Sequence, residues 1–533
     1  MGSGALLWWL LAAPPPRDSS RYVEAYVGDP PPLNPLLVRP GQRGAELLPL
    51  IYRSLARADV SGTVWPDLAT WQVSEDGLEY TIQMQQGVTW HDGAPVSADD
   101  VMFTVALLRR MEDDGGEEGS FWQDVELETH DPLRVVARLS QPLASFPDHL
   151  TFFVLPRHAL AEITTENLLN HPFNQRPIGT GAYRVRAFDP AALVLEAPSE
   201  SAASIKTVEV RFVATSAAAL SLARAGQVDG VSNVTYSLSE QLATATTQAA
   251  YEIPERAKLA LLALNTRAGP FAKASARKAA NLGIDRETVV LRALGGHAEP
   301  AEGPIPRQSW AFWRSDNVMS HDPAAAVTLL EEDGWRLAAD GVRETREGRL
   351  AFTLLTDDSD ERLAVAGELA RQLGAIGFAV RIRPLPADEL EENYLATGQF
   401  EAALIGQRQP GADPDPYPQW HSSQARGQGA NISGLQDADI DRLLERGRQT
   451  TDPGERLDAY IHFQARWLEE QPVIPLYHPV YRFTANRELR GISALPVPDA
   501  SWRLRDVATW RWERPVTARQ RWAQGLKRII GAP

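Results

Sequence analysis

Residues 71–110 carry the clearest pattern of hydrophobic and polar positions in the chain. Apolar and polar residues alternate over residues 78–85, which predicts a strand with one face toward solvent. Asp-Gly pairs at 76–77 and 92–93 predict tight turns of the type I′ class, in which both central residues have positive φ. Ser97 and Asp100 have the spacing of a helix N-cap and its first-turn acid, and apolar residues then follow at helical spacing. The segment therefore predicts strand, turn, strand, turn and capped helix, which is typical of an α+β domain.

Further along the chain the periodicity alternates between strand and helix. Residues 352–355 and 380–385 have strand patterns, and residues 364–376 between them have apolar positions at helical spacing. Residues 259–266 form a nearly continuous apolar run, as expected of a buried strand. This β-α-β order predicts a parallel sheet with crossover helices.

Length, net charge and the absence of cysteine exclude several classes of function for this chain. A chain of 533 residues is too long for one core, and length alone favours about three domains. The net charge of −16 argues against general nucleic-acid binding, because an acidic chain repels phosphate backbones. The chain has no cysteine, which excludes disulfides, thiolate catalysis and thiolate metal sites.

Catalytic and metal-binding motifs are absent from the sequence. It contains no HExxH, GxSxG or GxxxxGK[ST] motif, and its ten histidines show no paired ligand spacing. We therefore predict no catalytic residue, no metal site and no cofactor. A hydrolase acting in a cleft stays open as a less favoured alternative, and it would need two acids or a nucleophile and base that meet in the fold.

The order of residues 76–105, DGLEYTIQMQQGVTWHDGAPVSADDVMFTV, resembles the signature region of the bacterial extracellular solute-binding proteins of family 5. These are the peptide- and nickel-type receptors of ABC importers. Further resemblances lie at residues 177–183 (PIGTGAY), 259–266 (LALLALNT) and 284–287 (IDRE). The likeness covers about residues 21–512. Ala182 departs from the proline that the family usually has there.

The resemblance implies an α/β fold with two lobes, of the periplasmic-binding-protein or Venus-flytrap kind (cluster C), and an extra α+β domain inserted in the first lobe. The implied bounds are 21–46, 172–256 and 482–512 for lobe I, 47–171 for the extra domain and 257–481 for lobe II. The crossings between lobes are expected near residues 259–266 and 477–483.

The function that the resemblance implies is solute capture by hinge closure and delivery to the membrane permease of an ABC importer. The chain would act as a monomer in the periplasm or another extracytoplasmic place. A peptide-like solute is the first candidate, and an oligosaccharide, an opine or a metal chelate is the alternative.

Residues 403–435 are the expected ligand side of the second lobe. An apolar strand there leads into a loop with Asp413, Asp415, Tyr417 and Trp420, and ligands of α/β sheets bind beyond the carboxyl ends of strands. In peptide-binding relatives an acid of this loop pairs with the α-amino group of the ligand. Either Asp413 or Asp415 would hold that role, or neither, since both also suit turn capping beside proline.

Four other residues are candidates for ligand contact. Gln407 and Arg408 end the predicted strand, and Arg408 would meet a ligand carboxylate or form a salt bridge within its lobe. Tyr26 and Asn34 would border the cleft from the first lobe, or serve as ordinary strand-end and turn residues.

The two ends of the chain have their own signals. Residues 5–13 are apolar but too few to span a bilayer, so residues 1–20 are interpreted as the remnant of an export signal or as a disordered arm. Residues 503–533 hold eight basic and two acidic residues, and we interpret 513–533 as a basic extension. With its tryptophan, this extension would lie on an anionic membrane surface or form a solvated tail.

Overall fold

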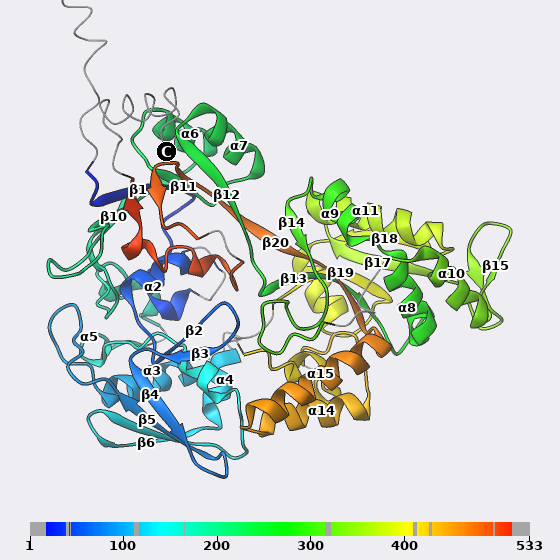
Figure 1. Cartoon of the computed structure of the whole chain (residues 1–533), viewed down its shortest axis with the longest axis horizontal. Coiled ribbons are helices and arrows are strands. Elements are labelled where there is room, and N and C mark those ends of the chain that lie inside the picture. Colours follow the sequence, from blue (N-terminus) through cyan, green and yellow to red (C-terminus); the bar gives the residue numbers. More distant parts are fainter. Residues whose placement is uncertain are drawn as a thin grey trace, which may run out of the picture.

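Two α/β bodies lie side by side and are joined by strands that run from one into the other (Figure 1). The structure is a computed structural model that describes residues 18–38, 42, 44–110, 117–164, 166–314, 321–408, 413–425, 429–493 and 496–513. The predicted signal remnant, up to residue 17, and the basic extension from residue 514 onward lie outside these ranges. Within them, no helix is both long and apolar enough to cross a membrane.

One sheet of twelve strands runs through both bodies. In spatial order its strands are β18 (Ala379–Leu385), β17 (Ala351–Asp357), β19 (Ala402–Arg408), β13 (Lys258–Leu264), β20 (Val473–Asn486), β11 (Gly230–Ser232), β1 (Arg21–Val27), β10 (Thr207–Val213), β9 (Ala192–Glu196) and β8 (Arg184–Phe188), while β12 (Gln248–Pro254) and β14 (Ala298–Pro300) also pair with β20. We call the body that contains β1 and β8–β12 the first lobe, and the body that contains β13, β14 and β17–β19 the second lobe.

The long strand β20 belongs to both lobes. Its early residues pair with β13, where Val473 lies opposite Ala263, and its late residues pair with β12, where Asn486 lies opposite Gln248. The chain also crosses between β12 and β13, which are three residues apart. Two crossings therefore connect the lobes: one runs through β20 and includes the expected residues 477–483, and the other lies between β12 and β13, just before the expected residues 259–266. The exact domain bounds stay a prediction.

A four-stranded antiparallel sheet forms the extra domain below the first lobe in Figure 1. Its strands, in spatial order, are β4 (Ala69–Val73), β5 (Glu79–Met84), β7 (Arg134–Arg138) and β6 (Glu126–Asp131). The described residues also form three sheets of two strands each: β2 (Ala56–Ala58) with β3 (Val64–Pro66), β15 (Arg336–Leu337) with β16 (Arg343–Glu344), and β21 (Leu489–Arg490) with β22 (Arg511–Trp512).

Helices connect the strands of these sheets, and most of them pack apolar side chains into a core. They are α2 (Leu48–Ile51), α3 (Ala98–Arg110), α4 (Glu117–Gln123), α5 (Arg157–Leu160), α6 (Ser216–Arg224), α7 (Tyr236–Ala245), α8 (Ala274–Gly283), α9 (Arg286–Ala293), α10 (Pro323–Glu332), α11 (Asp360–Ala375), α12 (Ala387–Glu389), α13 (Tyr417–Trp420), α14 (Ala438–Gln449) and α15 (Pro453–Glu470). In the second lobe, residues of α8–α11 share a core with one face of the sheet, and residues of α14 and α15 share a core with the other.

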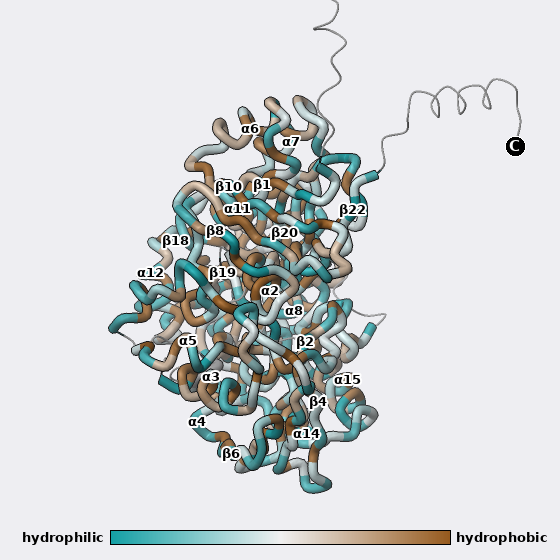
Figure 2. Tube along the Cα trace, turned by 90° about the vertical axis from the view of Figure 1, so that its left-hand side faces the viewer, coloured by the Kyte–Doolittle hydropathy of each residue, from teal (hydrophilic) through white to brown (hydrophobic). Residues whose placement is uncertain are grey.

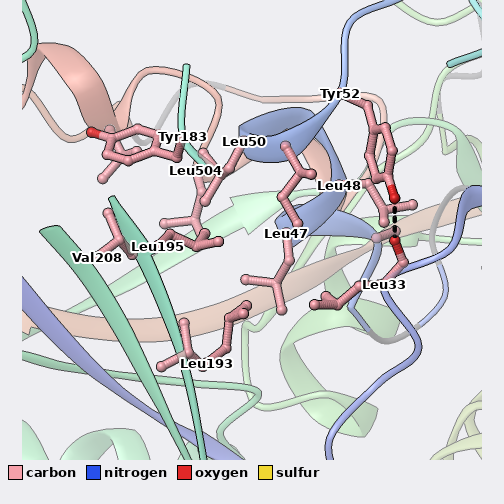
Figure 3. Close-up of a cluster of buried hydrophobic side chains, with 14 of the residues drawn as sticks. Leu33, Leu47, Leu48, Leu50, Tyr52, Tyr183, Leu193, Leu195, Val208 and Leu504 are labelled. Carbon is pink, nitrogen blue, oxygen red and sulfur yellow. Dashed lines mark hydrogen bonds between the residues drawn. The ribbon is translucent and has the colours of Figure 1, made fainter. Parts of the chain in front are cut away.

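The first lobe has its main core under α2. Figure 3 shows leucines of this segment against Leu193, Leu195 and Val208 of the sheet. The hydroxyl of Tyr52 donates to the carbonyl of Leu33 at 2.9 Å, so the buried phenol is satisfied. The extra domain has a separate core between its own sheet and α3.

The predicted unit at residues 71–110 is present as β4, β5 and the capped helix α3. The carboxylate of Asp100 accepts from the backbone nitrogen of Ser97 at 2.9 Å, which is the return half of a capping box. The expected turn type is wrong: Gly77 and Gly93 have φ of 72° and 92°, but neither aspartate has a positive φ, so these are not type I′ turns. The carboxylates of Asp76 and Asp92 instead accept from backbone nitrogens two residues on, as in Asx turns.

The loop at residues 177–183 lies close against the backbone of α2. The nitrogen of Gly181 donates to the carbonyl of Ile51 at 2.7 Å, and a Cβ on Gly179 would lie 1.9 Å from that same oxygen. His91 of the signature segment lies against this loop, with Nε2 3.0 Å from the carbonyl of Gly181. The segment that carries the family resemblance is therefore a structural joint between the extra domain and the first lobe.

Candidate functional site

A pocket lies where the second lobe faces the turn between β2 and β3. Its walls come from three segments that are far apart in sequence: the turn at 59–62, the loop at 304–309 after β14, and the loop at 413–420 after β19. Arg256, Ala257, Gln407 and Pro498 complete the lining. The space between these residues is about 650 Å³ when the part that is open to solvent is counted.

Two backbone hydrogen bonds hold the opposing sides together near this pocket. The nitrogen of Trp310 donates to the carbonyl of Ser61 at 3.1 Å, and the nitrogen of Ala144 donates to the carbonyl of Arg448 at 2.8 Å. Figures 1 and 2 both show α14, which carries Arg448, at the same end of the molecule as β6 of the extra domain. The structure thus has the two sides in contact, with the pocket between them.

Asp413 lines the pocket, and its carboxylate is engaged by the protein. Both oxygens accept from the guanidinium of Arg456 at 2.9 Å, and both residues are 9% exposed or less. Arg456 also donates to the carbonyl of Gly447 at 2.9 Å and to the hydroxyl of Tyr460 at 3.1 Å. Burial lowers the pKa of Arg456, but the charge of Asp413 outweighs it and raises that pKa above its ordinary value. This bidentate pair fixes the loop to α15.

Asp415 and Tyr417 form a second fixed group in the same loop. One oxygen of Asp415 accepts from Nε of Arg448 at 2.8 Å, and the other accepts from the nitrogen of Tyr417 at 3.1 Å. The guanidinium of Arg448 lies 4.0 Å over the ring of Tyr417, whose ring also stacks on His421 at 4.1 Å. Because Arg448 and His421 both pack against the ring of Tyr417, little of the face of this ring is left for a ligand.

Trp420 and Gln407 also line the pocket, and their contact with a ligand stays a prediction. Trp420 is only 4% exposed, and its ring meets Trp467 edge-on at 5.4 Å inside the core of α14 and α15. Gln407 lies on β19 and is half-buried, so its amide keeps a path to the pocket. Gln407 is therefore the predicted residue best placed to bond a solute without losing an internal partner.

Four predicted residues are not part of the lining: Tyr417, described above, and Tyr26, Asn34 and Arg408. Tyr26 is 1% exposed in the first-lobe core and meets Phe212 edge-on at 6.0 Å. Asn34 is fully buried, accepts from the nitrogen of Leu36 and donates to Asn174 at 3.0 Å. Arg408 forms an ion pair with Asp499 at 2.9 Å, and Asp499 belongs to the segment after β20, so this pair does not stay within the second lobe.

Sequence reasoning missed the turn at 59–62, the loop at 304–309 and Gln419. The residues Asp59-Val60-Ser61-Gly62 have the composition of a turn, and that signal predicts exposure but not which surface the turn meets. Within the described ranges, no group of three or more histidine or acidic side chains is arranged to hold a metal ion.

Two α/β lobes linked by crossing strands, with a pocket where the second lobe meets the turn between β2 and β3, are the architecture of a two-lobed binding protein. Comparison with known proteins agrees: the family model described as "Bacterial extracellular solute-binding proteins, family 5 Middle" matches residues 63–429. The chain belongs to this family of bacterial extracellular solute-binding proteins.

Individual relatives resemble nearly the whole chain. The oligopeptide-binding protein AppA of Bacillus subtilis is 25% identical over 504 residues, which is 91% of each chain. The probable D,D-dipeptide-binding periplasmic protein DdpA of Escherichia coli is 23% identical over 456 residues, 82% of this chain and 83% of that one. The crystal structure of NikZ from Campylobacter jejuni with Ni(L-His) superposes with a TM-score of 0.70 at 25% identity, covering 93% of this chain and all of the other.

Proposed function

We propose that this protein is an extracytoplasmic receptor that binds a peptide-like solute between its lobes and delivers it to the membrane permease of an ABC importer. The observation that supports this most is the pocket walled by both sides of the molecule. A solute held there contacts both sides at once, and only such differential contact shifts an open–closed equilibrium. The protein works as a monomer and catalyses no reaction.

The chemistry of the pocket suits a peptide-like solute. Its lining combines proline rings and one tryptophan edge with the amides of Gln407, Gln419 and Gln308. Side-chain amides offer both donors and acceptors, which match the alternating groups of a peptide backbone. Relatives named as oligopeptide- and dipeptide-binding proteins support the same class.

A metal chelate is the second candidate, because NikZ was crystallised with Ni(L-His) and is 25% identical to this chain. In that case we expect the protein to hold the organic part of the chelate, since the described residues contain no cluster of three or more histidine or acidic side chains that suits a metal ion.

The test begins with native mass spectrometry of the purified protein to detect solute carried through purification. Calorimetric titrations then compare a pooled tripeptide library, maltotriose and a nickel–histidine complex. We expect the peptides to bind, the radius of gyration in X-ray scattering to fall on saturation, and the peptides to remain uncleaved. Binding of maltotriose or the nickel complex alone would overturn the peptide assignment, and peptide turnover would overturn the receptor role.

A further inference from the structure

Gln419 is a buried side chain that lines the pocket without a hydrogen-bond partner of its own. It lies on α13 and is 8% exposed, and within the described ranges no residue bonds its side-chain amide. The other glutamines of these ranges that are at least as buried all donate to an oxygen of the protein: Gln248, Gln372, Gln464 and Gln471. A buried amide that stays unbonded costs free energy, so the exception at Gln419 needs a physical explanation.

The amide of Gln419 opens onto the pocket. Oε1 of Gln471 is enclosed by protein and has no partner, whereas neither polar atom of the Gln419 side chain is enclosed in this way. The backbone that carries Gln419 is held in place, because its nitrogen donates to the carbonyl of Pro416 at 3.3 Å and the next residue, Trp420, packs on Trp467. Gln419 therefore offers one acceptor and one amino group from a fixed segment of the wall.

Two further amides belong to the same wall of the second lobe. Gln407 is half-buried on β19, and in the part of the chain that the structure describes its side chain is not bonded either. Oε1 of Gln308 accepts from Nη1 of Arg256 at 2.7 Å, which leaves the amino group of Gln308 as a donor. This wall thus carries uncharged donors and acceptors.

The charged side chains of the lining are already engaged by the protein. The two acids of the loop at 413–420 pair with arginines, and Arg256 donates to Glu299 at 2.7 Å. The carboxylate of Asp59 accepts four hydrogen bonds from the residues that follow it and also interacts electrostatically with Arg505. A charged end of a solute gains little from groups whose charge is already compensated, so an uncharged part of the solute suits this pocket better.

The uncharged part of a peptide is its internal backbone. In an extended chain the N–H and C=O of one residue point to the same side, as in the hydrogen-bonded pairs of an antiparallel sheet. A side-chain amide carries its donor and acceptor next to each other, so it can bond both of these groups at once. The first residue of a peptide has an ammonium in place of the N–H, and the last has a carboxylate in place of the amide C=O. A tripeptide is therefore the shortest peptide with one residue that can be bonded in this way.

We propose that Gln419 binds the backbone N–H and C=O of one internal residue of the solute, and that the pocket therefore selects peptides of three or more residues over dipeptides. The inference rests on the proposed function and names the solute class for that site. The turn at 59–62 belongs to the same lining from the other side of the molecule, so a residue held by Gln419 contacts both sides.

The test compares Gln419→Met with Gln471→Met. Methionine is unbranched and close to glutamine in length, but it lacks the amide donor and acceptor. Gln471 is a matched control, because it is also a buried glutamine of the second lobe but does not line the pocket. The probes are a pooled tripeptide library and the same library built with a central α-hydroxy acid, in which an ester oxygen replaces the central N–H. Each library is titrated by calorimetry.

Wild-type protein and Gln471→Met should bind the amide library about tenfold more tightly than the ester library, because the ester removes one hydrogen bond to Gln419. Gln419→Met should bring the two affinities within about twofold by weakening mainly the amide library. A preserved tenfold preference in Gln419→Met would overturn the proposal, as would an equal loss for both libraries. If Gln419→Met does not melt cooperatively, Gln419→Ser replaces it, because the serine hydroxyl is too short to reach both backbone groups.

A second measurement needs no variant. A pooled dipeptide library should bind wild-type protein at least tenfold more weakly than the tripeptide library, and equal affinities would overturn the selection by length.

These results separate the inference from the function beneath it. Wild-type protein that binds no peptide library refutes the peptide receptor and, with it, the backbone contact. Wild-type protein that binds the amide and ester libraries equally supports the receptor and overturns the role of Gln419.

Discussion

At the scale of single residues, similar local sequence hides different roles. Asp413 and Asp415 each precede a proline, and both were equal candidates for ligand contact. Their partners, Arg456 and Arg448, lie 43 and 33 positions away on two different helices. Sequence patterns report local structure, so they could not show that both carboxylates are already paired, nor that Asp59 lines the same pocket.

Asp413→Ala should destabilise the protein far more than Asp415→Ala. The first change leaves Arg456 buried and uncompensated, and breaking such a pair costs about 3–5 kcal/mol. The second leaves Arg448, whose side chain is 30% exposed and can be hydrated, so we expect about 1 kcal/mol or less. Urea denaturation of both variants measures the difference, and equal midpoints would show that the Asp413 pair is not a main support of the loop.

Gln407→Ala should weaken solute binding about tenfold without changing the melting temperature. A lost hydrogen bond in a pocket costs about 1–1.5 kcal/mol, and 1.4 kcal/mol corresponds to tenfold in affinity. Gln399→Ala serves as the control, because Gln399 is exposed on the same lobe and does not line the pocket. Calorimetry with the tripeptide library measures both variants, and unchanged affinity in Gln407→Ala would remove this amide from the site.

At the scale of elements, the predictions succeed where one face of a strand or helix is buried. The pattern of β17, α11 and β18 predicts a parallel β-α-β unit, and the two strands pair in parallel register. The pocket-lining turn at 59–62 and loop at 304–309 have no comparable periodicity, because loops satisfy their backbone groups locally and need no regular apolar face. The two Asp-Gly pairs also show that a dipeptide indicates a turn without determining its type.

Gly179→Ala should destabilise the protein, whereas Gly367→Ala should stabilise it. The new Cβ at position 179 would overlap the carbonyl of Ile51 in the core of the first lobe and disturb the loop at 177–183, against which His91 of the extra domain lies. Gly367 lies within α11 with no atom within 4 Å of a new Cβ, and alanine in a helix is favoured over glycine by about 0.5–1 kcal/mol. Thermal melting tests both changes; a tolerated alanine at 179 would mean that the joint adapts freely.

At the scale of the whole molecule, the resemblance predicts two lobes and two crossings, and the structure has both. The residues that meet across the pocket were not predictable from local patterns. Asp59 and Asp413 lie far apart in the sequence, and both line the pocket. They come close in space because β12, β13 and β20 set the orientation of the two lobes.

The contact between the extra domain and α14 should make stability depend on pH through His149. Burial, with a smaller contribution from Arg448, lowers the pKa of His149 to about 3 from an ordinary value of 6.5. Between these values the unfolded chain binds more protons than the folded one, so stability falls as pH drops below about 6.5. His149→Phe keeps the stacking on Phe121 and removes this titration.

The melting temperature of His149→Phe should therefore fall less between pH 7 and pH 4 than that of the wild type. His462→Gln is the control, because His462 is exposed on α15. Parallel pH profiles for wild type and His149→Phe would rule out a contribution from His149.

The unbroken course of β20 determines where rotation between the lobes is absorbed. Fourteen residues form one strand that hydrogen-bonds to β13 at one end and to β12 at the other, with β14 alongside its middle. We expect a relative rotation of the lobes to be taken up as twist along this strand and at the register shift of its ladder beside Ala260 and Leu261, because no loop interrupts the strand. Amide hydrogen exchange along β20 should consequently remain slow with and without solute, while the exposed turn at 59–62 becomes protected only when the site is occupied.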